Sequence, residues 1–287
     1  MSPLLDASAC HNLLRSFLAE DIGTGDITTE TTVSAIQRAR GEVIAKAPLV
    51  LAGIELFAEV FHLLDLTTSV EILCHDGEEL TTGKVPARVN ASARALLTGE
   101  RVALNLLQRL SGIATLTRRF VRAIVGTEAE ILDTRKTTPG LRALEKYAVR
   151  VGGGKNHRKD LGEAVLIKES HIRLAGSVSA ALTAVQAAKG RVRWIEIEVT
   201  TLDELGAALP HNPDVILLDN MNPSLVRQAV EQVCKHSPQN KIRTEASGGI
   251  TLENVREFAE AGVNWISIGA LTHSAPAVDL SFEIEPE

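Results

Sequence analysis

The sequence predicts an α/β protein in two parts, a mixed N-terminal region and a parallel sheet with crossover helices. From residue 130 onward, short apolar runs alternate with amphipathic stretches, mostly at the spacing that βα units need. The first part lacks this alternation, and its strand-like runs precede one long helical segment, residues 98–126. A period-two alternation at residues 279–285 predicts a half-exposed strand that returns to the N-terminal sheet.

The first part is expected to begin with an amphipathic helix, because Leu13, Leu14, Phe17 and Leu18 share one helical face. Residues 1–23 lack a basic start and carry charges among their apolar positions, which argues against a signal peptide. Three strand-like runs follow: GEVIAKA (41–47), SVEILC (69–74) and ARVNAS (87–92).

The long segment 98–126 predicts one or two helices with Thr98 as the N-cap. Arg101, Asn105 and Gln108 fall on one face of this segment at helical spacing. Taken alone, such a polar face indicates exposure to solvent.

The second part is expected to form six parallel strands joined by helices. The predicted strands are EILDT (130–134), AVLIK (164–168), WIEIEV (194–199), DVILLD (214–219), KIRTEA (241–246) and WISIG (265–269). The predicted helices cover residues 141–151, 177–189, 202–208, 224–236 and 252–261.

Composition narrows the class of protein. A chain of 287 residues suggests one large or two modest domains, and 45% hydrophobic with 3% aromatic residues predicts a sizeable, mainly aliphatic core. The net charge of -6 argues against a general nucleic-acid binder. The one dense basic run, residues 155–160, contains no aromatic residue on which a base could stack.

The cysteines and the hydropathy pattern indicate a cytoplasmic setting. Cys10, Cys74 and Cys234 are far apart and show neither CxxC nor Cys/His metal spacing, so we expect buried free thiols in a reducing compartment. No apolar run approaches the ~20 residues of a membrane-spanning helix. We therefore expect a soluble cytoplasmic protein without a membrane partner.

Polar or charged groups follow every predicted parallel strand. Inside a strand such groups cost free energy unless they are partnered, but at the carboxyl ends of parallel strands they mark the active face of α/β proteins. In strand order these groups are Thr134, Arg135 and Lys136; Lys168; Glu196 and Glu198; Asp219 and Asn220; Glu245, Ser247, Gly248 and Gly249; and Ser267 and Gly269.

The cations among these groups indicate an anionic substrate. Arg135, Lys136 and Lys168 join His157 and Arg158 of the GGGKNHR loop in one predicted cluster. Such a cluster suits a ligand with several carboxylates or phosphates, because guanidinium groups match their planar geometry.

The remaining groups indicate a metal and a phosphate. Glu198 and Asp219 offer hard oxygens that suit Mg²⁺ or sugar hydroxyls. Backbone N–H groups at Ser247–Gly249 and at Gly269, which we expect just before helices, can surround a phosphate. The residues alone therefore predict a phosphorylated, multiply anionic substrate set with a divalent metal.

Simpler interpretations remain open for several of these features. Lys168 could only form a surface salt bridge, Glu198 could be a solvated strand end, and the glycines at 152–154 could form a flexible hairpin. SGGI (247–250) could be a turn with Thr251 as a helix N-cap. EDIGTGDIT (20–28) follows a helix rather than a strand, so we expect a structural loop and not a dinucleotide site. Lys155 and Lys159 are expected to be surface charges.

Several long segments, in order, resemble the quinolinate phosphoribosyltransferase family, also called nicotinate-nucleotide pyrophosphorylase. The resemblance covers nearly the whole chain, including EDIGTGDIT. Its motifs are ERVALNLLQRLSGIAT (100–115), DTRKTTPGLRALEKYAVRVGGGKNHR (133–158), LIKESHI (166–172), IEIEV (195–199), LLDNM (217–221), EASGGI (245–250) and SIGALTHSAP (267–276).

The resemblance implies an N-terminal α/β sandwich domain at 1–112, rejoined by the tail 272–287, and an incomplete β/α barrel at 113–271. It implies that quinolinate and phosphoribosyl pyrophosphate, with Mg²⁺ and no organic cofactor, give nicotinate mononucleotide, pyrophosphate and CO₂ in de novo NAD biosynthesis. It also implies a homodimer in which the partner completes each active site, and it leaves open whether dimers assemble further.

The family pattern also implies residue roles. The catalytic set is Lys136, Glu198 and Asp219, of which the two acids meet ribose hydroxyls and metal. Arg101 matches an arginine contributed across the dimer interface. The groups around the quinolinate carboxylates and the phosphates are Arg135, Lys136, His157, Arg158 and Lys168. The remaining substrate contacts, which include the 5′-phosphate cradle, are Thr134, Ser247, Gly248, Gly249, Ile268, Gly269, Ala270 and His273.

Three alternative functions were weighed. A transferase of the same fold could use another base such as nicotinate, although a diacid better explains so many cations. A Schiff-base aldolase could use Lys168 as its nucleophile. A non-catalytic protein could bind the phosphate donor without turnover, but Glu198 and Asp219 would oppose anion binding unless a metal or ribose is present.

Overall fold

The computed structural model describes residues 7–239 and 241–287. Residues 1–6 of the segment judged not to be a signal peptide lie outside this range. The chain forms two compact units. Unit 1 comprises residues 1–118, 143–153 and 274–287, and unit 2 comprises residues 119–142 and 154–273.

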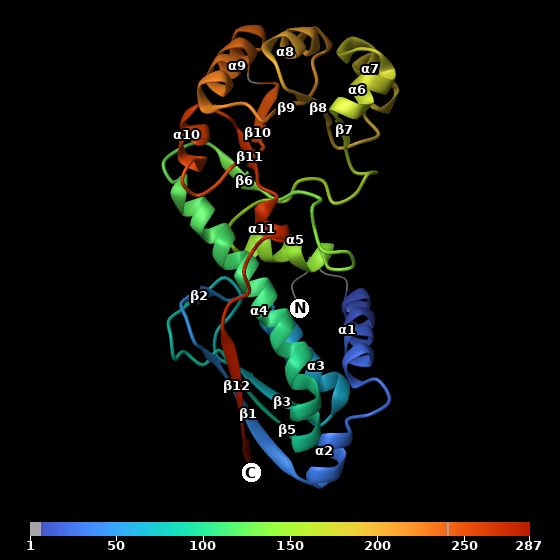
Figure 1. The fold of residues 1–287 in the computed structure, drawn as a ribbon, viewed down its shortest axis with the longest axis vertical. Helices are drawn as coiled ribbons and strands as arrows, with labels where there is room; N and C mark the ends of the chain where they lie inside the picture. The colour runs from blue at the N-terminus through green and yellow to red at the C-terminus, as the bar shows by residue number, and fades with distance from the viewer. Residues whose placement is uncertain (1–6, 240) are drawn as a thin grey trace. The chain divides into compact units, whose positions relative to one another are not determined.

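Unit 1 contains a four-stranded antiparallel sheet in the order β12-β1-β5-β3. Its strands are β1 (Arg38–Ala45), β3 (Ser69–Ile72), β5 (Ala87–Ser92) and β12 (Leu280–Pro286). Two short strands, β2 (Leu49–Val50) and β4 (Glu79–Leu80), pair separately. β12 lies along β1 with Leu280 opposite Ala45, so the prediction that the tail returns to the N-terminal sheet is confirmed (Figure 1).

An aromatic cluster fills the core beside this sheet. Phe282 of β12 stacks on Phe61 at a ring-centroid distance of 5.4 Å, and its edge meets Phe57 at 5.6 Å. A Cβ at Gly41 of β1 would lie 2.0 Å from the Phe282 ring, so only glycine fits beside it. Phe57 and Phe61 belong to α3 (Ile54–Leu64), a helix that the sequence analysis missed.

The long helix is a single element, α4 (Ala93–Ala123), and the prediction of Thr98 as its N-cap is wrong. The helix begins directly where β5 ends, because the Ser92 hydroxyl accepts the N–H of Ala95 at 3.2 Å. Thr98 instead lies inside the helix and donates to Asp26. Of the polar face, Arg101 is exposed, but Gln108 donates to the Leu280 carbonyl, so the face is solvated only in part.

The EDIGTGDIT segment joins two helices, α1 (Ala7–Ile22) and α2 (Ile27–Thr32). Asp26 is the N-cap of α2, accepting the N–H of Thr29 at 3.0 Å, and it also accepts from Thr98. The prediction of a structural loop is therefore confirmed. The amphipathic N-terminal helix is confirmed too, with Leu14 and Leu18 buried.

The glycines after α5 (Arg142–Val151) serve packing rather than a hairpin. A Cβ at Gly152 would lie 2.6 Å from the Ala114 carbonyl oxygen of α4. Gly153 follows with φ +96°, a left-handed conformation that favours glycine. The alternative that 152–154 form a flexible hairpin is therefore wrong.

Unit 2 contains a six-stranded parallel sheet in the order β6-β11-β10-β9-β8-β7. The number of strands agrees with the six that were predicted. The strands are β6 (Glu130–Leu132), β7 (Val165–Ile167), β8 (Ile195–Val199), β9 (Val215–Asp219), β10 (Arg243–Ser247) and β11 (Trp265–Ser267). The first strand pairs with the last, which is barrel order, but β6 and β7 do not pair among the described residues. The sheet is thus the predicted incomplete barrel.

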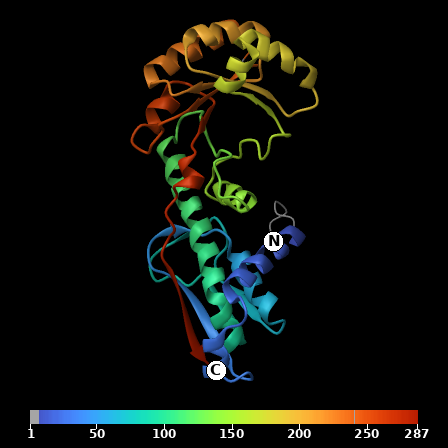
Figure 2. The same cartoon turned by 45° about the vertical axis from the view of Figure 1, so that its right-hand side comes forward.

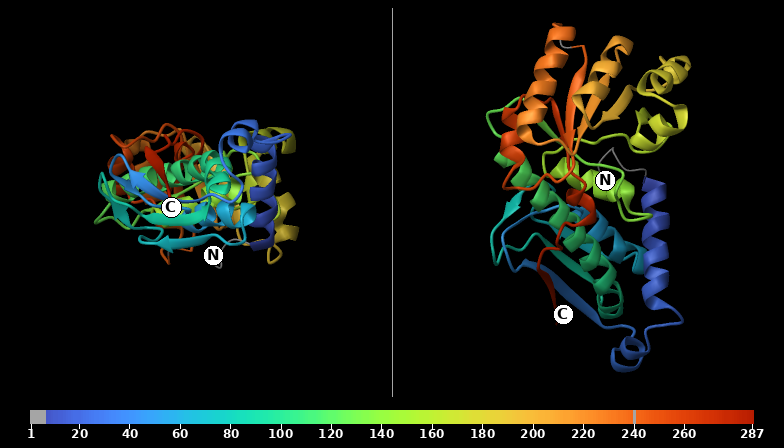
Figure 3. Two further views of the ribbon diagram at one scale, coloured as in Figure 1. Left: turned by 90° about the horizontal axis from the view of Figure 1, so that it is seen from below. Right: turned by 45° about the horizontal axis from the view of Figure 1, so that its top comes forward.

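Helices α7, α8 and α9 lie along the outer side of this sheet (Figures 2 and 3). Side chains of Ser177, Thr201 and Asn222 cap their N-termini. The helical elements of unit 2 after β7 are α6 (Glu169–Ala175), α7 (Val178–Val185), η1 (Gln186–Ala188), α8 (Leu202–Ala208), η2 (Leu209–His211), α9 (Pro223–His236), α10 (Val255–Glu260) and α11 (Ala270–His273). Among the described helices, none is long and apolar enough to cross a membrane.

The cysteines are free thiols, and one of them corrects the prediction of burial. Cys10 and Cys74 are buried, but Cys234 on α9 is exposed. The buried face of α9 carries Val226 and Val233, and the residue after Val233 points about 100° away from that face.

Candidate active site

A cavity of about 700 Å³ lies at the carboxyl ends of the strands in unit 2. Every predicted site residue except Arg101 lines it: Thr134, Arg135, Lys136, His157, Arg158, Lys168, Glu198, Asp219, Ser247, Gly248, Gly249, Ile268, Gly269, Ala270 and His273. Arg101 lies on α4 in unit 1, with its side chain exposed. The structure therefore brings together the residues that follow different strands.

Asp133 positions the cationic loop beside the end of β6. This carboxylate is completely buried, and it accepts the backbone N–H of His157 at 2.9 Å and the side-chain amide of Asn156. Lys155 extends the sheet by a parallel bridge to Leu132. These contacts place His157 and the residue after it next to the segment that follows β6.

Two arginines, Arg135 and Arg158, line the cavity. Arg158 is 5% exposed, and its Nη1 donates to the Ala164 carbonyl at 2.8 Å. Burial, and then the charge of Arg135, lower the pKa of Arg158. The Nε of Arg135 is buried without a hydrogen-bond acceptor among the described residues. Two close cations with an unused donor favour an anionic ligand between them.

A pair of acids, Glu198 and Asp219, lines the same cavity. In the register of β8 and β9, Glu198 lies opposite Leu217, two residues before Asp219. Burial, and then the charge of Glu198, raise the pKa of Asp219. Lys168 pairs with Glu198, with 3.2 Å between Nζ and Oε2, while both residues line the cavity. Two hard carboxylates that repel each other in this way fit a divalent cation or sugar hydroxyls.

A glycine turn follows β10. Gly248 has φ +93°, and a Cβ there would lie 2.2 Å from Oδ1 of Asn220. Gly249 has φ +62°, so both positions favour glycine and leave their backbone open to the cavity. The alternative of Thr251 as a helix cap is wrong, because its N–H donates to Asn254 and α10 begins only at Val255. The expectation that this turn directly precedes a helix is also wrong.

The segment after β11 also lines the cavity. A Cβ at Gly269 would lie 3.0 Å from Cδ of Lys136 and 3.1 Å from Nε2 of His273. The Thr272 hydroxyl donates to the Lys136 carbonyl at 2.7 Å, which fixes α11 to the segment after β6. Here the helix does begin at the residue after the glycine, as predicted.

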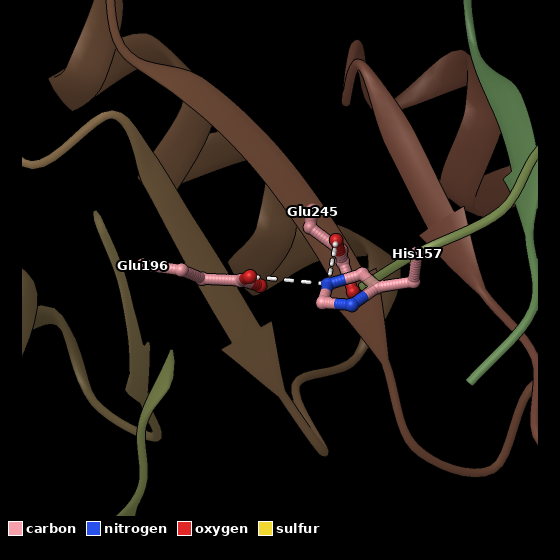
Figure 4. A group of neighbouring side chains, drawn as sticks. All are labelled: His157, Glu196 and Glu245. Atoms are coloured by element: carbon pink, nitrogen blue, oxygen red, sulfur yellow. Dashed lines mark ion pairs between the residues drawn. The ribbon is translucent and has the colours of Figure 1, made fainter. Parts of the chain in front are cut away.

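The sequence analysis assigned no role to a buried cluster at the edge of the cavity. Glu196 of β8 and Glu245 of β10 both point at Nε2 of His157, at 3.0 Å and 3.4 Å (Figure 4). Their side chains are 0% and 1% exposed. The signal that could have found them was an acidic residue inside each buried strand, because such a charge requires a partner.

The contacts within this cluster also shift the pKa values of His157 and Glu245. Burial alone would lower the pKa of His157, but hydrogen bonds and charge from Glu196 and Glu245 outweigh it and raise the pKa to about 10. The N–H of Arg158 donates to the other ring nitrogen, Nδ1, at 2.9 Å, which opposes a second proton there. In either form Nε2 carries a proton. Burial, and then the charge of Glu196, raise the pKa of Glu245.

The cavity thus combines cations, a pair of acids and a glycine turn at the carboxyl ends of barrel strands, an arrangement that fits phosphorylated, multiply anionic ligands. The family models agree with this class. The quinolinate phosphoribosyl transferase N-terminal domain matches residues 26–111, and the C-terminal domain matches residues 113–283. The chain belongs to the quinolinate phosphoribosyltransferase family.

The similarity to known proteins extends over almost the whole chain. A probable nicotinate-nucleotide pyrophosphorylase (carboxylating) from Bacillus subtilis is 47% identical, with 95% of this chain and 92% of the relative covered. A nicotinate-nucleotide pyrophosphorylase (carboxylating) from Mycobacterium leprae is 43% identical, with 96% and 97% covered. The crystal structure of NadC from Streptococcus pyogenes has a TM-score of 0.92 at 37% identity, with 99% of both chains covered.

Proposed function

We propose that this protein is a quinolinate phosphoribosyltransferase (decarboxylating). It transfers the phosphoribosyl group of phosphoribosyl pyrophosphate to quinolinate and releases pyrophosphate and CO₂. The product, nicotinate mononucleotide, supplies de novo NAD biosynthesis. The observation that carries this proposal is the gathering of Arg135, Lys136, His157, Arg158 and Lys168 in one cavity with an acid pair and a glycine turn.

The cations are proposed to bind the two quinolinate carboxylates and the phosphates. Arg135 and Arg158 suit the carboxylates, because a guanidinium binds a carboxylate through two parallel hydrogen bonds. The buried Nε of Arg135 has no acceptor among the described residues, so a ligand carboxylate would satisfy it. Lys136 and Lys168 are exposed, which suits mobile contacts to phosphate oxygens.

Glu198 and Asp219 are proposed to hold Mg²⁺, directly or through water, and to contact the ribose. Burial, and then the charge of Glu198, raise the pKa of Asp219, and a divalent cation would stabilise the ionised form of both acids. A bound Mg²⁺ would supply positive charge opposite the departing pyrophosphate. As pyrophosphate leaves, positive charge develops on the ribose ring, and these acids are placed to stabilise it.

The glycine turn is proposed to hold the 5′-phosphate. Ser247, Gly248, Gly249 and Gly269 all line the cavity, and their backbone N–H groups are proposed to donate to the phosphate. With the phosphate there and the carboxylates at the arginines, the quinolinate nitrogen attacks the anomeric carbon. The resulting pyridinium draws electrons from the neighbouring carboxylate bond, and the buried surroundings favour loss of CO₂.

We further propose a cytoplasmic homodimer with shared active sites. Arg101 is exposed on α4 and lies in the motif 100–115, which resembles the segment that reaches across the interface in this family. The described cysteines form no disulfide, which fits a reducing compartment.

One incubation tests the proposed reaction. Purified protein with quinolinate, phosphoribosyl pyrophosphate and Mg²⁺ should give nicotinate mononucleotide and equal amounts of pyrophosphate and CO₂, identified by mass spectrometry and pyrophosphate release. A matched incubation with EDTA should give much less. The absence of a nucleotide product with Mg²⁺ would contradict the proposal. A borohydride-trapped adduct on Lys168 would instead favour the aldolase alternative.

A further inference from the structure

The cluster of His157, Glu196 and Glu245 has a function that the binding of substrate does not explain. Two carboxylates converge on one imidazole nitrogen in a place closed to solvent. Burying one charge beside one imidazole is common, but a second carboxylate of the same sign adds repulsion and a second desolvation cost. The cluster therefore has to keep an additional proton.

The contacts indicate which acid keeps it. Oε2 of Glu196 accepts the Trp194 indole N–H at 2.9 Å and lies 3.0 Å from Nε2 of His157. Glu245 lies farther from the same nitrogen, at 3.4 Å, and among the described residues its buried oxygens have no counterpart to the indole N–H that Glu196 accepts. The proton thus belongs on Glu245.

The groups around Glu245 support the same assignment. Glu196 faces it from β8, His157 faces it from the loop after the bridge to β6, and Ser267 of β11 lies close enough to affect it. Burial and the charge of Glu196 favour the neutral acid, while His157 and Ser267 act in the opposite direction. The net direction is a raised pKa, which agrees with the geometry.

The position of Glu245 places this proton near the reacting atoms. Glu245 lines the cavity, although Glu196 does not. It precedes Ser247 of the proposed phosphate turn by two residues on β10, and its neighbour His157 directly precedes Arg158 of the proposed carboxylate site. A substrate that spans these two proposed sites would lie beside Glu245, which lines the cavity between them in sequence.

We propose that Glu245 is the acid that protonates the pyridine ring carbon as CO₂ leaves, with Glu196 and His157 holding it neutral until then. This inference rests on the proposed function. The bond between the ring carbon and the carboxyl group breaks, its electron pair stays on the carbon beside the pyridinium nitrogen, and CO₂ departs. The Glu245 proton then bonds to that carbon, and water restores the proton after product release.

A weak acid suits this step. Because Glu196 disfavours a second charge, Glu245 would not yield its proton to the substrate carboxylates during binding. It would yield the proton to a ring carbanion, which is a far stronger base. Glu245 is therefore a catalytic residue in this account, and Glu196 and His157 are positioning residues.

The test separates the two halves of the reaction. Glu245→Gln keeps the shape but removes the acidic proton. We expect pyrophosphate release within a few-fold of wild type in a single turnover, but formation of nicotinate mononucleotide slowed by about 10²-fold or more, with the dicarboxylate mononucleotide accumulating. Glu245→Asp, which restores an acid, should recover part of the second step.

Three results would overturn the inference. Equal slowing of both steps, or no slowing of either, would show that Glu245 does not act as the acid. About one equivalent of tightly bound metal in the purified protein would make the cluster a metal site, since its ligand atoms lie within 4.8 Å of one another. If the wild-type protein failed to release pyrophosphate with quinolinate, the proposed function itself would be contradicted. This result differs from each of the three above, so failure of the inference and failure of the proposed function can be told apart. Circular dichroism and quinolinate binding check that each variant is folded.

Discussion

Lys168 and Glu198 form an ion pair across the ends of two neighbouring strands, with Nζ 3.2 Å from Oε2. Parallel pairing of Ile167 with Ile197 sets this register, so each partner is the next residue along its strand. The Lys168 side chain is 50% exposed, so the pair adds at most about 1 kcal/mol to stability. Its placement in the cavity matters more, because Lys168 can balance the acid until substrate and metal arrive.

The first prediction concerns Glu198. Glu198→Gln keeps the side-chain volume but removes the charge proposed to stabilise the developing ribose cation. We expect kcat to fall by on the order of 10²-fold, with the quinolinate dissociation constant changed much less. Steady-state kinetics and isothermal titration on the same preparation measure the two quantities. Equal losses in both would argue against a role in the transition state.

The second prediction tests the shared active site. Arg101→Ala and Arg158→Ala proteins should each have little activity, because each removes one cation from every site. After subunit exchange, one site of each hybrid dimer is native, so activity should recover toward about a quarter of wild type. Native mass spectrometry confirms the exchange. Confirmed hybrids without recovered activity would contradict a site completed by the partner.

The third prediction concerns the glycine turn. Gly248→Ala would place a Cβ 2.2 Å from Oδ1 of Asn220 at a φ of +93°, so the turn has to shift. We expect KM for phosphoribosyl pyrophosphate to rise at least about tenfold, since lost phosphate hydrogen bonds are charge-assisted. Gly126→Ala is the matched control, because its φ is +88° and no atom would lie within 4 Å. It should lose some stability but keep its KM; a similar KM change in both variants would refute the assignment.

The fourth prediction is a pH dependence of stability at Asp65, which follows α3. Side-chain and backbone donors of Thr67, with the N–H of Ser92, lower the pKa of Asp65 to about 2. The folded pKa lies below the unfolded one, so the stabilisation is complete above about pH 4 and is lost as pH falls toward 2.

Asp65→Asn should therefore lower the free energy of unfolding at pH 7 by about 2 kcal/mol or less. The difference from wild type should shrink as the pH falls below 4, which thermal melts at pH 7, 4 and 3 would measure. Glu128→Gln, at an exposed acid, is the control and should follow wild type throughout. A difference for Asp65→Asn that stays constant with pH would contradict the assignment.

The elements of unit 2 could be predicted because parallel strands and helices impose a regular pattern. The same pattern brought Lys168, Glu198 and Asp219 to one edge of the sheet, where the structure places them. The prediction of Thr98 as the N-cap of the long helix was wrong, because the start of a helix depends on where the preceding strand ends. In the structure, the Ser92 side chain supplies the cap. No local signal tells which of two possible caps the tertiary structure uses.

The buried cluster of His157, Glu196 and Glu245 could not be predicted from the sequence for a different reason. Glu196 and Glu245 were visible as acids in apolar strands, but their convergence on His157 depends on strand order and on the loop that Asp133 holds. Strand order is a long-range property, and it could be inferred only through the family resemblance. The helix α3, which was not predicted, carries Ile54, Phe57 and Phe61 on its buried side, and this apolar spacing is the local signal for it in the sequence.

The central claim is that the cationic cavity selects a diacid. The most direct measurement compares quinolinate and nicotinate in parallel incubations with phosphoribosyl pyrophosphate and Mg²⁺, following nucleotide and CO₂. The account predicts nucleotide and CO₂ in equal amounts from quinolinate and little nucleotide from nicotinate, because one carboxylate leaves buried cations such as Arg158 unpaired. Efficient nucleotide formation from nicotinate, with none from quinolinate, would contradict the reading of the cationic cluster.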